Sequence, residues 1–130
     1  MIKIMHLDSC TAYHISQNLD RASDAERRFY ELSQQVTRPF LDADQLSAIV
    51  RELVGLGGYI AVANVDTDDL DVAYRQTNHI TSDWTLNGEV EALAKRPRAS
   101  SVGDVFIHDG TAYVVAPFGF ERIDGLEVVA

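Results

Sequence analysis

The sequence predicts a single α+β domain over residues 1–130, with a mainly antiparallel sheet, a C-terminal β-hairpin and two to three helices packed on one face. Two observations lead to this fold class. Apolar runs on both sides of Asp109-Gly110 are typical of a two-residue hairpin turn. Two capping-box patterns, Ser23-Asp-Ala-Glu26 and Asp42-Ala-Asp-Gln45, each precede apolar residues at helical spacing.

The first half of the chain begins with a strand pattern and continues with helix patterns. Apolar residues over 2–7 indicate an opening strand, and the mixed polar stretch 9–20 indicates a loop. The helix that begins after Ser23 should end before Pro39, because proline restricts the residue that precedes it. Three glycines within 55–58 then end the second helix.

The middle of the chain carries one strand and one helix pattern. Residues 59–65 are apolar on both faces, which is typical of a central strand. A short helix over 68–77 follows, capped by Asp66 or Thr67. The remaining expected elements are a helical turn over 89–94, an exposed basic connector over 95–99 and a last edge strand over 126–129.

The C-terminal hairpin is apolar on both sides. The turn places His108 opposite Thr111, and it puts Phe106 and Tyr113 on one side of the hairpin. The other side receives Val105, Ile107, Ala112 and Val114. One side should pack on the helices, whereas the Phe106 side must be covered by the chain itself, by a partner or by a second subunit in a homodimer.

Charge and cysteine content narrow the functional classes. Twenty acidic and eleven basic residues give a net charge of −9, which argues against direct nucleic-acid binding. No apolar run is long enough to span a membrane, and residues 1–8 lack the pattern of a secretion signal. Cys10 is the single cysteine, so no intramolecular disulfide forms, and we expect a cytoplasmic protein.

No catalytic, cofactor or metal site is predicted. Ser101 and Asp104 are best explained by hydrogen bonds to backbone N–H groups in a turn, with Gly103 in a conformation that other residues avoid. The four histidines show no spacing of a zinc site, and the glycines form no phosphate-binding loop. An enzyme need not carry a motif that can be recognised, so a small enzyme of unrecognised type is the alternative from a different functional class.

The single tryptophan, Trp84, stands in a stretch without sustained periodicity. We interpret it as a half-buried anchor that attaches a long loop to the core. The alternative is an exposed aromatic contact for a partner.

The second half of the chain resembles the small YodL-like proteins of phages, plasmids and other mobile elements. The resemblance covers roughly residues 57–123 and is carried by Asp69-Leu-Asp-Val-Ala-Tyr-Arg-Gln-Thr-Asn78, Trp84, Ser100-Ser-Val-Gly-Asp-Val105, Ala112-Tyr-Val-Val115 and Gly119-Phe-Glu121. It implies an accessory protein of a mobile element, with interaction and counter-defence roles. It supplies no active site to carry over.

The leading hypothesis is therefore a non-enzymatic protein-binding or inhibitor module of a phage or mobile element that acts on a host protein, as anti-CRISPR proteins do. One alternative is an acidic nucleic-acid mimic that blocks a DNA- or RNA-binding host enzyme. The residues expected to contact the partner combine carboxylates with aromatic side chains. They are Asp66, Asp68, Asp69, Asp71, Trp84, Phe118 and Phe120.

Overall fold

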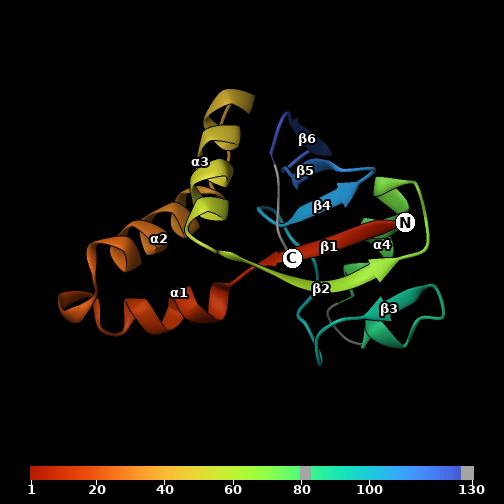
Figure 1. Cartoon of the computed structure of the whole chain (residues 1–130), viewed down its shortest axis with the longest axis horizontal. Coiled ribbons are helices and arrows are strands. Elements are labelled where there is room, and N and C mark those ends of the chain that lie inside the picture. Colours follow the sequence, from red (N-terminus) through yellow and green to blue (C-terminus); the bar gives the residue numbers. More distant parts are fainter. Residues whose placement is uncertain (80–82, 127–130) are drawn as a thin grey trace.

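The computed structural model describes residues 1–79 and 83–126 and confirms the α+β fold (Figure 1). Its centre is a six-stranded antiparallel sheet in the order β3-β2-β1-β4-β5-β6. The first strand of the chain thus lies inside the sheet, between strands that come much later. The strands are β1 (Ile2–Leu7), β2 (Tyr59–Val65), β3 (Val90–Ala92), β4 (Val105–His108), β5 (Thr111–Val115) and β6 (Phe120–Ile123).

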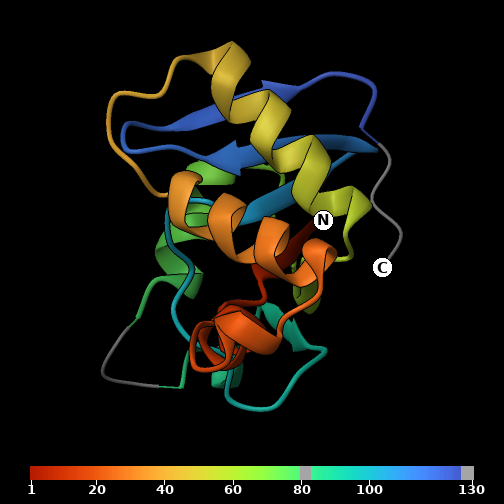
Figure 2. The ribbon, with the colours of Figure 1, turned by 90° about the vertical axis from the view of Figure 1, so that its left-hand side faces the viewer.

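Three helices cover one face of the sheet, as Figures 1 and 2 show: α1 (Ser9–Ser16), α2 (Asp24–Gln35) and α3 (Ala43–Gly55). Their apolar sides and one side of the β4–β5 hairpin form the first hydrophobic core. This arrangement confirms the prediction of two to three helices on one face. It also confirms that Val105 and Val114 point toward these helices.

A fourth helix, α4 (Leu70–Thr77), and the 3-10 turn η2 (Trp84–Leu86) pack on the opposite face and enclose a second core. Phe106 is completely buried there, with its ring centroid 6.4 Å from that of Tyr74 and 5.4 Å from that of Phe120. On the second apolar side of the hairpin the chain itself therefore covers Phe106, whereas Tyr113 is half-buried. Burial of Phe106 needs no second subunit.

The hairpin register agrees with the sequence prediction at each position. His108 lies opposite Thr111, and Phe106 lies opposite Tyr113. The two turn residues, Asp109 and Gly110, have φ values of 50° and 76°. Positive φ at both central positions matches the right-handed twist of the flanking strands, so the turn chemistry sets the register.

Both predicted capping boxes are present. The Ser23 hydroxyl accepts a hydrogen bond from the Glu26 backbone N–H at 3.1 Å, and the Glu26 carboxylate accepts one from the Ser23 N–H at 2.9 Å. Asp42 and Gln45 make the same reciprocal pair at 2.7 and 3.0 Å. These bonds satisfy N–H groups that have no partner within the helix, so α2 and α3 begin where the sequence predicts.

Two local predictions at helix starts are wrong. The stretch expected to be a loop contains α1, whose cap is Asp8: its carboxylate accepts from the Thr11 N–H at 3.0 Å. The cap of α4 is Asp69, not Asp66 or Thr67, because the Asp69 carboxylate accepts from the backbone N–H groups of Asp71 and Val72, the second and third residues of that helix.

The segment after η2 also differs from expectation. Val90–Ala92 forms β3 against β2 instead of a helical turn, because its backbone pairs with Ala63–Val65 at the sheet edge. The expected last strand over 126–129 lies, apart from Leu126, outside the described residues. Among residues 1–79 and 83–126, no helix has the length and apolar character that crossing a bilayer requires.

Candidate functional site

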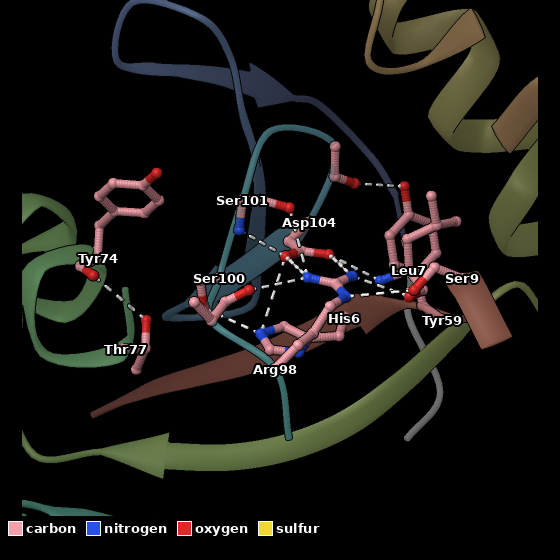
Figure 3. A network of polar contacts seen from close by, with 12 residues as sticks. His6, Leu7, Ser9, Tyr59, Tyr74, Thr77, Arg98, Ser100, Ser101 and Asp104 are labelled. Carbon is pink, nitrogen blue, oxygen red and sulfur yellow. Dashed lines mark hydrogen bonds and ion pairs between the residues drawn. The ribbon is translucent and has the colours of Figure 1, made fainter. Parts of the chain in front are cut away.

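A buried carboxylate, Asp104, organises the loop before β4 (Figure 3). Its oxygens accept hydrogen bonds from the backbone N–H groups of Leu7 and Ser101, both at 2.8 Å. The Tyr59 hydroxyl donates to the Gly103 carbonyl at 2.8 Å, and Gly103 has a φ of 94°. The prediction is confirmed for Asp104, which binds backbone N–H groups in a turn, and for the positive φ of Gly103. The Ser101 hydroxyl, however, accepts from the Arg98 guanidinium at 3.4 Å and not from a backbone N–H.

Arg98 neutralises this carboxylate. Its two terminal nitrogens donate to the two Asp104 oxygens, each at 2.7 Å. Its other partners are the Leu7 carbonyl at 2.9 Å, the Ala99 carbonyl at 3.0 Å, the Ser9 hydroxyl at 3.3 Å and the Ser101 hydroxyl at 3.4 Å. A guanidinium has five N–H donors, so Arg98 has none left for a ligand. Arg98 is exposed, as expected for the basic connector, but its guanidinium also joins strand β1 to the loop before β4.

His6 and Ser100 complete the network. His6 Nε2 lies 2.9 Å from Ser100 Oγ and 3.8 Å from an Asp104 oxygen. Burial lowers the pKa of His6 from 6.5 to about 4, and the nearby Asp104 charge offsets this only in part. The ring packs edge-on against Trp84, with centroids 6.1 Å apart.

These three residue types are those of a serine hydrolase, but their geometry does not fit one. In a catalytic triad the serine and the acid contact opposite nitrogens of the imidazole ring. Here Ser100 and Asp104 both approach Nε2 of His6, and all three side chains are buried. Asp104 is also held by Arg98. The cluster of His6, Arg98, Ser100 and Asp104 therefore acts as a structural lock, which connects β1 to the loop before β4.

Sequence reasoning missed this cluster. His6 comes from β1, whereas Arg98, Ser100 and Asp104 follow more than half the chain later. One signal was available: His6 occupies the same alternating positions of the strand as Ile2 and Ile4. A histidine on a buried face needs a hydrogen-bond partner.

The predicted partner-binding residues are only partly brought together. Asp68, Asp69, Asp71 and Phe120 line one open hollow of about 560 Å³, here called the acidic hollow. Its lining residues are Asp68, Asp69, Leu70, Asp71, His108, Tyr113, Gly119 and Phe120. Asp66 is exposed but does not line it. Phe120 is half-buried against the second core, so part of its ring is used inside the fold.

Local contacts account for two of these carboxylates. Asp69 caps α4. Asp68 accepts a hydrogen bond from the Met1 amino group at 3.0 Å and lies 3.2 Å from Nε2 of His108, and these contacts lower the pKa of Asp68. The acidic stretch thus has structural roles at the start of α4, in addition to any contact with a partner.

Trp84 lies in the core. Only 3% of it is exposed, and its indole N–H donates to the Arg98 carbonyl at 3.1 Å. It therefore fixes η2 to the loop before β4 and offers no surface to a partner. This placement corrects the alternative in which Trp84 is an exposed contact.

A second hollow, here called the apolar groove, lies between the α2–α3 connection and the β5–β6 turn, which run side by side in Figure 2. It measures about 470 Å³. Its lining residues are Val36, Arg38, Pro39, Phe40, Leu41, Leu46, Ala116, Pro117, Phe118 and Glu121. Val36 and Leu46 belong to the first core, so the floor of the groove is part of the packed interior.

Two phenylalanines belong to the lining of this groove, one from each segment. Phe40 is 99% exposed and Phe118 is 97% exposed, more than any other large apolar side chain in the described part of the chain. Phe40 also has a φ of 69°, a left-handed conformation that is unfavourable for a bulky residue. Phe118 was predicted as a contact, whereas Phe40 was missed because the sequence there indicated only the end of a helix at Pro39.

The β5–β6 turn joins the two hollows. Ala116, Pro117 and Phe118 line the apolar groove, whereas Gly119 and Phe120 line the acidic hollow. Any partner that covers Phe118 would therefore come close to both. This surface presents apolar area next to charge.

Within residues 1–79 and 83–126, no group of three or more histidine, cysteine, aspartate or glutamate side chains is placed to hold a metal ion. Comparison of the chain with protein-family models, curated proteins and solved structures gives no match. The resemblance to YodL-like proteins stays a prediction from the residues that carry it.

Proposed function

We propose that this protein is a binding module that attaches to another protein through the apolar groove. The observation that carries the proposal is the nearly complete exposure of Phe40 and Phe118 in the lining of one apolar hollow. Exposed aromatic side chains beside a preformed hollow are typical of interaction surfaces. The backbone of Phe40 supports the same interpretation, because unfavourable conformations tend to persist where function needs them.

Burial of these two side chains would supply a substantial part of the binding free energy. Burying one phenylalanine side chain contributes about 1.5–3 kcal/mol. Phe40 and Phe118 are both almost fully accessible, so nearly all of their apolar area is available to a partner. Loss of either ring should weaken binding by roughly tenfold to a hundredfold.

The biological role that we propose is inhibition of a host protein by a phage or other mobile element, in the host cytoplasm. This part of the proposal rests on the resemblance to YodL-like proteins, with the single cysteine and the acidic composition as further support. A host defence complex that normally binds nucleic acid is one such target. The nucleic-acid mimic receives less support, because Asp68 and Asp69 serve local contacts around α4.

The test is affinity purification from host lysate with matched variants. Phe40→Asn combined with Phe118→Ser removes both rings, and asparagine tolerates the positive φ at position 40. Leu86→Ser is the control, because Leu86 is 82% exposed and lies beside β3, at the opposite edge of the sheet.

Proteins captured by the wild type should fall at least about tenfold with the double variant and remain with Leu86→Ser. Equal capture by wild type and double variant would contradict the proposal. So would turnover of a substrate by the purified chain in the absence of any captured protein.

A further inference from the structure

We infer that the segment that docks in the apolar groove is a basic protein segment. One of its apolar side chains enters the groove beside Phe40 and Phe118, and its lysine or arginine side chains reach the carboxylates around the β5–β6 turn. This inference rests on the proposed function and specifies the chemistry of the partner.

The apolar part follows from the walls of the groove. A space of about 470 Å³ is larger than one side chain, and it is floored by core residues such as Leu46, which is 3% exposed. A floor that belongs to the packed core is already ordered before binding, so an anchor side chain can enter without rearranging the fold. The two exposed rings then cover that anchor from solvent.

The charge of the partner follows from the carboxylates on both sides of the turn. Glu121 lines the groove and Asp71 lines the acidic hollow, and neither side chain has an ion pair or hydrogen bond among the described residues. Asp69 adds a further exposed negative charge to the hollow, whereas the charge of Asp68 is offset by the Met1 amino group at 3.0 Å. Arg38 is the only basic side chain in the described lining of the groove. A partner with positive charge is therefore attracted and a negative one repelled.

A second copy of this chain fits less well. Each copy carries a net charge of −9, and an association of two grooves would bring the carboxylates of both copies together. Repulsion between like charges at an interface opposes such a dimer. A basic segment meets the same surface with charges of opposite sign.

The experiment is selection of a random displayed peptide library on the purified full chain. Three variants are compared with the wild type: Phe40→Asn with Phe118→Ser, Asp71→Asn with Glu121→Gln, and the control Asp20→Asn with Asp24→Asn. The control removes the same number of exposed charges away from the groove, one at the first residue of α2 and one in the 3-10 turn that precedes it.

Selected peptides should combine an aromatic or large aliphatic residue with nearby lysine or arginine. Their affinity should fall at least about tenfold when both rings are removed. It should fall about threefold to tenfold when Asp71 and Glu121 are neutralised, stay unchanged in the control, and weaken as salt is raised.

The possible failures are distinguishable. If peptides require Phe40 and Phe118 but show no excess of basic residues and no effect of Asp71 and Glu121, the inference is overturned while the proposed function stands. If no selected peptide depends on the two rings, both are overturned. A dimer in sedimentation that Phe118→Ser abolishes would assign the groove to a second copy and likewise refute the basic partner.

Discussion

The stability of this protein should decrease in mildly acidic solution because of one residue, His6. Its pKa is about 4 in the folded chain, against 6.5 for an ordinary histidine, because burial disfavours the charged ring. Between these two values the unfolded chain binds a proton that the folded chain does not. The contribution of His6 is therefore complete above about pH 6.5 and is lost as the pH falls toward about 4.

The size of this effect follows from the difference between the two pKa values. In that window the free energy of unfolding changes by about 1.4 kcal/mol per pH unit. Between about pH 7.5 and about pH 5 the loss from His6 alone amounts to about 2 kcal/mol. Carboxylates with lowered pKa values, such as Glu26 and Glu52, lose their contribution mainly below this range.

Urea unfolding of the wild type and of His6→Gln at both pH values measures the effect. Glutamine can still hydrogen-bond to Ser100, but it does not titrate. The variant starts from lower stability because packing against Trp84 is lost, so the informative quantity is the change with pH. Wild type should lose about 2 kcal/mol more than the variant. Parallel losses in the two proteins would refute the assignment of a buried, neutral histidine.

Substitutions at four further positions test the packing. Arg98→Ala leaves a buried carboxylate without its cation, so the free energy of unfolding should fall by about 3–5 kcal/mol in a urea titration, and a loss below about 1 kcal/mol would contradict the lock. Gly103→Ala forces a side chain at a φ of 94° and within 3.0 Å of Val36, so it should destabilise by about 1–3 kcal/mol. Gly55→Ala, where nothing lies within 4 Å, should be neutral or stabilising in the same assay. Phe106→Ala should lower the free energy of unfolding by about 3–5 kcal/mol, and Phe106→Asp should unfold the chain. A Phe106→Asp protein that is folded by circular dichroism would contradict the complete burial of Phe106 in the second core.

Much of the fold could be predicted because it depends on contacts between residues that are close in sequence. Asp109-Gly110 determines its own turn, and the turn determines which hairpin residues face each other. The boxes at Ser23 and Asp42 likewise close within one helical turn. In these places local hydrogen bonds and periodicity agree with the tertiary structure, which is where reading a sequence is dependable.

The features that the sequence did not predict depend on contacts that the spacing of residues does not reveal. Helix α1 has few apolar residues, and its two buried ones, Ala12 and Ile15, gain their burial from α2 and the sheet. Arg98 is part of a visibly basic, proline-containing stretch, yet its role depends on a carboxylate that the fold brings beneath it. Phe40 lies in a stretch where apolar residues follow no helix or strand period. The groove exists only because the β5–β6 turn approaches that residue from the far end of the chain.

The position of β1 in the middle of the sheet has a consequence for how the chain acquires its structure during synthesis. Ile2 pairs with Val65 on one side and with His108 on the other, so the strand made first must wait for both neighbours. Closing such long loops is slow because the entropy is lost before the contacts form. Until β4 leaves the ribosome, helices α1 to α3 have no complete surface on which to pack. A nascent chain that stops short of the Asp109-Gly110 turn would therefore expose its apolar faces to chaperones and proteases.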